Sequence, residues 1–225
     1  MGTKEIEAKI GSFWDDYAHK FDAEHNTEDP AAWAEAFKGC LGAGGPSTIL
    51  DLGTGTGFLA NMAAAMGHFC LGLDIADRML GIAVEKSRAL GLRVVYLKGS
   101  VLDLPFPGDV FDYVVNARLL WTLVEPRKTI AHWVRFVRPG GRIVCFNRFR
   151  DGLGMCGGKD VYGDESVDGA VTLAHVPSSA ELVGLFEGAG LTDVSFRLLP
   201  DLTKAEHREG LDSWHALIGT KPRAR

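Results

Sequence analysis

The stretch that decides the fold is Ile49-Leu50-Asp51-Leu52-Gly53-Thr54-Gly55-Thr56-Gly57-Phe58-Leu59-Ala60. It begins as a short apolar run, passes through an acid and three glycines at alternate positions, and ends in an apolar segment typical of a helix start. Glycines permit the sharp backbone bend and the close ligand approach that such a strand-to-helix turn requires. A turn of this kind, at the N-terminus of a helix, is a common site for nucleotide-like ligands. The sequence therefore predicts a nucleotide-binding turn.

The spacing of the glycines distinguishes between classes of nucleotide. A dinucleotide-binding turn has the pattern Gly-x-Gly-x-x-Gly, but here the third glycine comes one position early and Phe58 stands in its place. Asp51 would lie beside a diphosphate, where like charges repel, whereas an acid suits a ligand that carries a cationic amino group. We therefore expect a positively charged nucleoside and not a dinucleotide.

Outward from this turn, apolar strand-like runs alternate with helical patterns, and each run is bounded by turn residues. Strands are expected at 48–52, 69–74, 93–98, 111–116, 142–147, 194–199 and 214–219, and helices at 4–22, 29–42, 58–66, 78–90, 126–137 and 178–188. Apolar strands separated by helices indicate a parallel sheet covered on both faces. The last two strands have no clear helix between them. The predicted fold class is α/β, with a doubly wound, mostly parallel seven-stranded sheet and an antiparallel edge pair at the C-terminus.

The overall composition narrows the class of protein. The net charge of −5 argues against a nucleic-acid partner, which usually requires a clustered basic face. No apolar run approaches the roughly 20 residues needed to span a bilayer, and the polar N-terminus does not resemble a secretion signal. The four cysteines have no Cys-x-x-Cys spacing and are interpreted as buried reduced thiols, not metal or redox groups. We expect a cytoplasmic protein with no membrane contact and no metal site.

The ends of the predicted strands carry the candidate site, because ligands of open α/β sheets bind beyond the carboxyl ends of the strands. Asp74 ends the second strand and could accept hydrogen bonds from both hydroxyls of a ribose. Ile75 and Met79 follow it and could cover an adenine face. Asn116 ends the fourth strand, near the place where a reacting group would lie. Asp74 could also be a plain helix cap.

Four stretches, Leu50–Gly57, Gly72–Leu80, Gly99–Val115 and Val137–Val144, are similar in order and spacing to the motifs of one family. The chain resembles the class I S-adenosylmethionine-dependent methyltransferases, of the small-molecule subgroup that includes quinone-biosynthesis enzymes. The resemblance implies S-adenosyl-L-methionine as cofactor and S-adenosyl-L-homocysteine as product. It also implies that the glycine turn contacts the methionyl part of the cofactor, that Asp74 binds the ribose and that the pair at 100–101 borders the adenine.

The cofactor-binding residues expected from the turn, the strand ends and the resemblance form one set. They are Tyr17, Phe21, Asp51, Gly53, Thr54, Gly55, Gly57, Asp74, Ile75, Met79, Ser100, Val101 and Asn116. Ser100 stands where aspartate is common in the family, and Phe21 where tyrosine is frequent. The pattern of residues 13–22 is similar to the N-terminal helix that closes over the cofactor. We expect one methyltransferase domain over residues 1–225, with 1–42 as a helical lid and 148–170 as a mobile substrate-side insertion.

The acceptor side is less well defined. Its expected residues are His25, Trp33, Leu120, Trp121 and Asn147, of which Trp121 could equally fill the core. Many relatives have histidines after the fourth strand, whereas this chain has Leu120-Trp121-Thr122, so a histidine base there is unsupported. No catalytic residue is assigned. His19 is the one candidate, although an exposed helix residue explains it as well.

The predicted reaction is in-line transfer of a methyl group to an oxygen, nitrogen or carbon nucleophile of a small molecule, by a monomer or homodimer. Three other interpretations remain open. One is a protein or RNA methyltransferase, the second is a dinucleotide-dependent reductase, and the third is a non-catalytic protein that binds S-adenosylmethionine.

Overall fold

The computed structural model describes residues 2–42, 44–150, 154–155, 161–175, 178–200, 202 and 213–223, with Arg150 described by its backbone alone. Its elements in chain order are α1 (Thr3–Glu24), α2 (Pro30–Leu41), β1 (Thr48–Leu52), α3 (Phe58–Ala65), β2 (Phe69–Asp74), α4 (Asp77–Ala89), β3 (Val94–Lys98), β4 (Phe111–Ala117), η1 (Leu120–Thr122), α5 (Pro126–Val134), β5 (Val137–Arg150), β6 (Gly154–Met155), α6 (Glu165–Asp168), η2 (Thr172–His175), α7 (Ser179–Gly188), β7 (Thr192–Leu198) and β8 (Ser213–Thr220).

The sheet confirms the predicted fold class. Its strand order is β3-β2-β1-β4-β5-β8-β7, and the pairs from β3 to β5 are parallel. β8 and β7 add to β5 in antiparallel fashion and form the expected edge pair. A short eighth strand, β6, pairs with the end of β5 and was not predicted. The chain order reverses between β1 and β4, so the carboxyl ends of these two strands border the crevice where ligands of such sheets bind.

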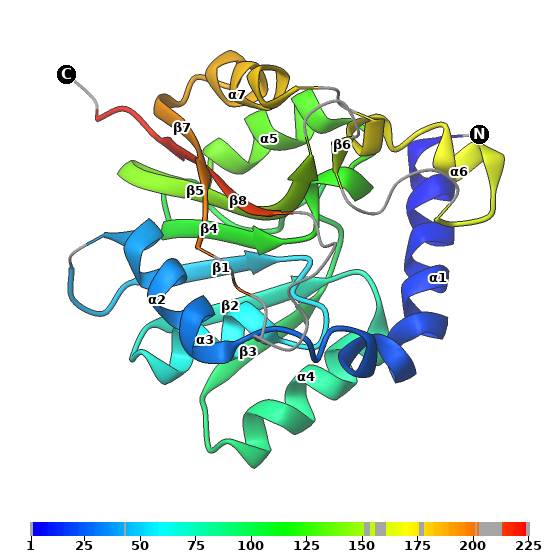
Figure 1. The fold of residues 1–225 in the computed structure, drawn as a ribbon, viewed down its shortest axis with the longest axis horizontal. Helices are drawn as coiled ribbons and strands as arrows, with labels where there is room; N and C mark the ends of the chain where they lie inside the picture. The colour runs from blue at the N-terminus through cyan, green and yellow to red at the C-terminus, as the bar shows by residue number, and fades with distance from the viewer. Residues whose placement is uncertain are drawn as a thin grey trace.

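Helices cover both faces of the sheet. Successive strand residues point to opposite sides, so the apolar strands place buried side chains on both faces. Ile49 belongs to a core that also contains Trp33 and Phe37 of α2, whereas Leu50 belongs to a core that contains Trp133 of α5. α1 does not lie on either face. It stands across the carboxyl ends of the parallel strands (Figure 1).

One predicted boundary was wrong. A helix was expected over 126–137 and a strand from 142, but α5 ends at Val134 and β5 begins at Val137. Val137 already pairs with Phe111, and the pairing resumes at Arg142 after a bulge. Gly140 (φ +86°) adopts the left-handed conformation in this bulge. The Pro-Gly-Gly segment therefore bends a strand and does not separate a helix from a strand.

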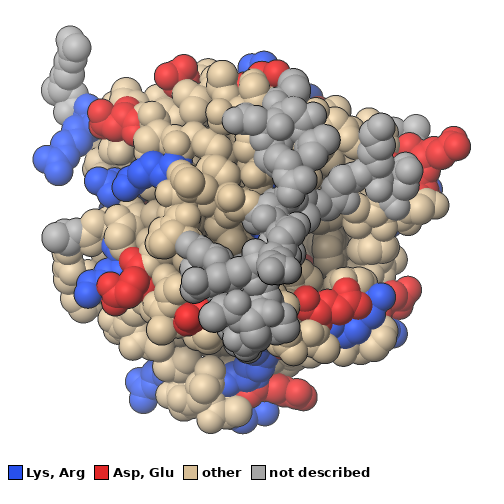
Figure 2. All heavy atoms as spheres, in the orientation of Figure 1, with Lys and Arg blue, Asp and Glu red and all other residues tan. Residues whose placement is uncertain are grey.

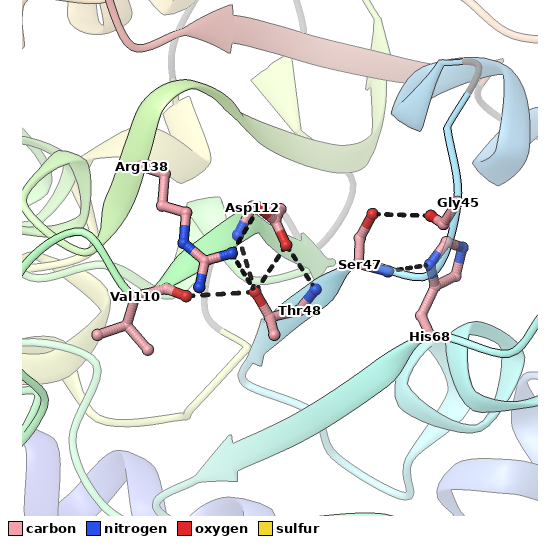
Figure 3. Close-up of polar contacts among 7 residues, drawn as sticks. All are labelled: Gly45, Ser47, Thr48, His68, Val110, Asp112 and Arg138. Carbon is pink, nitrogen blue, oxygen red and sulfur yellow. Dashed lines mark hydrogen bonds and ion pairs between the residues drawn. The ribbon is translucent and has the colours of Figure 1, made fainter.

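A polar network fixes β1 against β4 at the end of the sheet opposite the crevice (Figure 3). Asp112 accepts hydrogen bonds from the Thr48 N–H (2.7 Å) and hydroxyl (2.8 Å), and from Arg138 (2.7 Å). The Thr48 hydroxyl also lies 3.2 Å from the Val110 carbonyl oxygen. Burial alone would raise the pKa of Asp112, but the hydrogen bonds from Thr48 and Arg138 outweigh it and lower the pKa. The carboxylate therefore sets the register at the start of β1.

Three of the four cysteines, Cys40, Cys70 and Cys145, are buried free thiols, as predicted. Cys156 lies outside the described residues. Within the part of the chain that the structure describes, no helix combines the length and apolar character needed to cross a membrane.

We expect Asp112→Asn to lower the free energy of unfolding by about 1 kcal/mol at pH 7, because it weakens three hydrogen bonds to a partly exposed carboxylate. Since the pKa of Asp112 is lowered in the folded state, its contribution is present above the unfolded pKa of about 4 and is lost as the pH falls through the folded pKa. Urea denaturation of both proteins at pH 7 and pH 3 measures this.

The control for this substitution is Glu35→Gln, which removes one charge at an exposed position of α2. A difference between wild type and Asp112→Asn that is the same at both pH values would contradict the assignment.

Candidate functional site

A cavity of about 350 Å³ lies at the carboxyl ends of β1, β2 and β4. α1 forms one wall, and the turns after β1 and β2 form the floor. The loops after β3 and β4 complete the wall, together with Val161. The cavity therefore occupies the crevice that the strand order predicts.

The three glycines of the turn after β1 all have positive φ, at +61° for Gly53, +54° for Gly55 and +83° for Gly57. A Cβ atom on Gly53 would lie 2.7 Å from Leu119, and one on Gly57 would lie 2.6 Å from the Tyr96 hydroxyl. A Cβ on Gly55 would meet no atom within 4 Å, although Gly55 lines the cavity. Protein packing thus requires glycine at 53 and 57, whereas at 55 the missing side chain leaves space in the cavity.

Asp51 holds this turn from behind. Its carboxylate accepts hydrogen bonds from the Thr54 hydroxyl (2.6 Å) and from the Ala60 N–H (3.1 Å) at the start of α3. Burial raises the pKa of Asp51 to about 7, against the lowering effect of these two hydrogen bonds. Asp51 and Thr54 do not line the cavity, so their contact with a ligand stays a prediction.

Asp74 holds the turn from the side of the cavity. Its carboxylate accepts hydrogen bonds from the Gly55 N–H (2.7 Å) and from the Ala76 N–H (2.9 Å), and it lines the cavity. Burial raises its pKa, and the backbone N–H groups oppose this. α4 begins three residues later with Ala76 as its N-cap, so Asp74 is not the cap of that helix. Each carboxylate oxygen keeps a lone pair for a further donor.

Acidic residues tie α1 over the cavity. Asp15 accepts a hydrogen bond from the Arg78 N–H (2.7 Å), and Asp22 accepts one from the Thr56 hydroxyl (2.6 Å). Glu7 accepts a hydrogen bond from the Ser100 hydroxyl. These contacts join one helix to the turn after β1, to the start of α4 and to the loop after β3.

Aromatic rings of α1 line the opposite side of the cavity from the strand ends. Trp14 packs edge-to-face against Tyr17 (5.6 Å between ring centroids) and Phe21 (6.2 Å), and Trp121 of η1 lies 6.0 Å from Trp14. The Tyr17 hydroxyl donates to Glu24, and burial raises the pKa of Tyr17 to about 12. This part of the cavity is therefore suited to a flat apolar group.

Arg118 marks the end of the cavity near His25. It follows β4 with φ +60°, an uncommon conformation for a residue other than glycine. Its guanidinium forms an ion pair with the buried Glu28 and lies 4.7 Å from the ring centre of Trp214. A positive group therefore lines the cavity close to His25.

The structure brings together ten of the residues expected in the site. Those that line the cavity are Tyr17, Phe21, His25, Gly53, Gly55, Asp74, Ile75, Met79, Val101 and Trp121. The expected residues that do not line it are His19, Trp33, Asp51, Thr54, Gly57, Ser100, Asn116, Leu120 and Asn147.

Three expected acceptor contacts lie elsewhere for identifiable reasons. Trp33 is fully buried against Phe58, Phe146 and Trp214, because α2 covers a face of the sheet and not its end. Leu120 is buried in the core under α5. Asn147 is buried within β5 and is not among the lining residues.

Two further expected residues also lie outside the cavity. Asn116 is fully buried and donates a hydrogen bond to the Cys145 sulfur (3.0 Å). His19 is exposed on α1, with its Nδ1 2.8 Å from the Asp16 carbonyl oxygen.

Sequence reasoning missed Glu7, Trp14 and Arg118, which all line the cavity. Glu7 and Trp14 lie on α1, and the helical period predicts which side of the helix each of them occupies. It does not predict that this side faces the cavity. Arg118 lies two residues beyond the predicted fourth strand and could have been found by extending the search past Asn116 and Ala117. Among the described residues, no group of three His, Cys, Asp or Glu side chains could hold a metal ion.

Comparisons with known proteins agree with this geometry. Residues 50–145 match a family model described as a methyltransferase domain. The demethylmenaquinone methyltransferase of Thermus thermophilus is 43% identical over 101 residues, which cover 44% of this chain and 46% of that protein. The demethylmenaquinone methyltransferase of Bacillus licheniformis is 29% identical over 72% of this chain and 77% of its own length. Against several such curated relatives, the chain spans about half of their length.

Solved structures share the fold at low identity. The [4+2]-cyclase SpnF superposes with a TM-score of 0.74 at 17% identity and covers 96% of each chain. An S-adenosylmethionine-dependent methyltransferase from Aquifex aeolicus superposes with a TM-score of 0.65 at 22% identity, over 92% of this chain and 97% of that one. Residues 50–145, which contain the glycine turn and Asp74, are therefore similar to a methyltransferase domain, and the whole chain has a fold that solved S-adenosylmethionine-dependent methyltransferases share.

Proposed function

We propose that the chain is an S-adenosylmethionine-dependent methyltransferase acting on a small-molecule acceptor that binds in the same cavity. The observation that carries this proposal is the pairing of Gly55, which leaves space, with Asp74, which presents a buried carboxylate to that space. The names of the relatives support methyl transfer. The cyclase among the structural neighbours is a reminder that the fold alone does not determine the reaction.

The residues present fit the cofactor. Asp74 would accept the ribose hydroxyls, and the space beside Gly55 would take the methionyl part. Ile75 and Met79 would pack on one adenine face, near Val101. Asp51 and Thr54 would act by holding the turn in shape.

Glu7 completes this arrangement at the adenine end. Apart from Asp74, it is the one carboxylate among the described residues that line the cavity. It is bonded to Ser100, beside Val101 and Leu102. Burial raises its pKa, which the Ser100 hydrogen bond opposes. An exocyclic amine is a donor that seeks such an acceptor, so we infer that Glu7, and not Ser100, receives the adenine amino group.

In the proposed mechanism the bound cofactor supplies an electrophilic methyl group, already activated by the cationic sulfur. The chain positions the donor and the acceptor and excludes water from the cavity. Asp74 and the glycine turn hold the donor, the aromatic rings of α1 hold the acceptor in line with the methyl group, and the tethered helix keeps water out. No general acid is needed, because the leaving sulfur departs as a neutral thioether.

The acceptor is proposed to be a flat aromatic molecule. Trp14, Tyr17 and Trp121 offer aromatic surface on the acceptor side, and the relatives are named for a demethylated quinone. On the face shown in Figure 2, Lys and Arg side chains alternate with Asp and Glu around the periphery. A mixed surface of this kind favours a small molecule over RNA as acceptor.

We also propose how the chain is organised around this reaction. Residues 1–225 form one domain in which α1 is the lid, while α2 of the expected 1–42 lid packs into a core. The expected insertion at 148–170 lies partly outside the described residues, but Val161 reaches the cavity. The free thiols of Cys40, Cys70 and Cys145 support a reducing compartment such as the cytoplasm. We propose a monomer or homodimer.

We expect Asp74→Asn to weaken binding of S-adenosyl-L-homocysteine by roughly 10- to 100-fold, because hydrogen bonds to a charged group contribute about 1.5–3 kcal/mol. Asparagine keeps an acceptor for only one of the two backbone N–H groups, because Gly55 and Ala76 donate to different carboxylate oxygens, so circular dichroism and thermal unfolding must show that the variant is folded. Isothermal titration calorimetry measures the affinity. Asp77→Asn, an exposed acid three residues later, is the matched control. An unchanged affinity in folded Asp74→Asn would refute the ribose assignment.

Replacing Gly55 with valine should abolish binding, since the side chain would fill the space beside the turn. Positive φ at this position adds strain to the variant whatever it does to binding. Gly91→Val is therefore the control: Gly91 also has positive φ (+67°) and no atom within 4 Å of a Cβ, but it does not line the cavity. Equal affinity of the two folded variants would show that the turn was misassigned.

Glu7→Gln tests the adenine end through ligand discrimination. Wild type should prefer S-adenosyl-L-homocysteine over S-inosyl-L-homocysteine by roughly 10-fold or more, because a carboxylate accepts from an amine and repels a carbonyl oxygen. Glutamine can donate or accept, so the variant should bind both ligands within about threefold. Glu5→Gln, exposed on the same helix, should behave as wild type. If folded Glu7→Gln discriminates as strongly as wild type, another group receives the amine.

A further inference from the structure

His25 is a cavity-lining histidine whose hydrogen position is set by its neighbours. It is the C-cap residue of α1 and is partly buried. Its Nδ1 lies 2.7 Å from the Phe21 carbonyl oxygen. A carbonyl oxygen only accepts, so Nδ1 must carry the hydrogen of the neutral ring, and Nε2 must carry the lone pair. Among the described residues, Nε2 has no hydrogen-bond partner of its own.

The plane of the ring is fixed as well. The His25 ring stacks on Phe21 with 4.2 Å between centroids and 23° between planes, and Phe21 lines the same cavity. Stacking acts on the face of the His25 ring, whereas the hydrogen bond to the Phe21 carbonyl oxygen acts at its edge, through Nδ1. Together they hold Nε2 in one direction, as a positioned proton acceptor requires.

The charges around His25 keep it neutral. Burial lowers its pKa, and so do the guanidinium groups of Arg118 and Arg148. The Phe21 carbonyl and Glu24 act in the opposite direction but do not outweigh them. Glu28 faces Arg118 and offsets part of that positive charge. The imidazole is therefore able to accept a proton at neutral pH.

The other polar groups of the cavity are engaged or unsuited. The Tyr17 hydroxyl donates to Glu24, and its pKa of about 12 rules it out as a base at neutral pH. The Thr122 hydroxyl donates to the Leu119 carbonyl oxygen (2.8 Å). Asp74 accepts two backbone N–H groups, Glu7 accepts a hydrogen bond from the Ser100 hydroxyl, and Arg118 is a permanent cation.

We propose that His25 is the catalytic base, and that its Nε2 takes the proton of an acceptor hydroxyl during methyl transfer. The inference rests on the proposed function. The hydroxyl proton moves to Nε2, and the electron pair it leaves is used, through oxygen or a conjugated ring carbon, to bond the methyl carbon. The carbon–sulfur bond breaks and its pair stays on sulfur. For attack through carbon, that carbon then loses its hydrogen as the hydroxyl is restored. Overall the acceptor exchanges H⁺ for CH₃⁺, and the imidazolium passes its proton to water.

The first test needs no acceptor. Long-range ¹H–¹⁵N spectra of histidine-labelled protein, with His25 identified by its loss in His25→Asn, should show hydrogen on Nδ1 and a titration midpoint below the ordinary 6.5. Asparagine keeps a donor for the Phe21 carbonyl oxygen and lacks Nε2, so the variant should fold. Hydrogen on Nε2, or a charged ring at pH 7, would overturn the proposal.

The second test is the pH profile of methyl transfer to a short-chain demethylmenaquinol. The kcat/KM of the wild type should fall at acid pH with the midpoint that the spectra give for His25. His25→Asn should lower kcat by about 10²- to 10³-fold and remove this acid limb, while its affinity for S-adenosyl-L-homocysteine stays within twofold. His175→Gln, exposed on η2, is the control. Wild-type kcat and an unchanged acid limb in His25→Asn would overturn the proposal.

Different results would contradict the proposed acceptor, the proposed function and the role of His25. A wild type that binds S-adenosyl-L-homocysteine but does not methylate the quinol contradicts the proposed acceptor, and the spectra still decide whether His25 has the form a base requires. A wild type that does not bind S-adenosyl-L-homocysteine contradicts the proposed function, and the role of His25 falls with it.

Discussion

The hydrogen bond between the Gly55 N–H and the Asp74 carboxylate is the contact on which the site depends. It joins the end of β2 to the turn after β1, while Asp51 joins the same turn to α3 from behind. Both acids are buried, which is unfavourable for a charged group unless donors surround it. Backbone N–H groups and the Thr54 hydroxyl supply those donors, so the charge and the shape of the turn maintain each other.

Charged side chains of both signs line the cavity. Asp74 and Glu7 line the cavity, with Asp51 behind the turn, and Arg118 lines it as well and lies close enough to His25 to lower the pKa of its imidazole. A cationic donor is favoured near the acids. In the proposed reaction, His25 takes up the proton that the acceptor loses. Arg118 and Arg148 disfavour the charged imidazole, so they promote release of this proton from His25 after the reaction. Different groups of one cavity therefore act on the donor charge and on the product proton.

The sequence predicts the cofactor end well because that end is encoded locally. Glycines at alternate positions and an acid at a strand end carry their meaning within a few residues, and Gly55 and Asp74 lie where the pattern places them. The acceptor end is not local. Trp33 was assigned to it because both N-terminal helices were expected to form the lid, but α2 packs on a face of the sheet. The same limit explains the early end of α5: Pro-Gly-Gly reads as a helix stop, although here it bends a strand whose pairing partner is set by tertiary structure.

The distribution of similarity along the chain bears on which reaction is catalysed. The matched domain covers 50–145 and therefore includes the glycine turn, Asp74 and Arg118, but it excludes α1 and Val161. Similarity over these residues supports the identity of the methyl donor more than the identity of the acceptor. A cyclase and a methyltransferase share this fold at low identity, so the outcome must be decided by groups that differ between them. In this chain the aromatic rings of α1, and His25 at its C-terminal end, are cavity-lining groups outside the matched domain. The acceptor is thus best sought by varying α1 while the glycine turn is left intact.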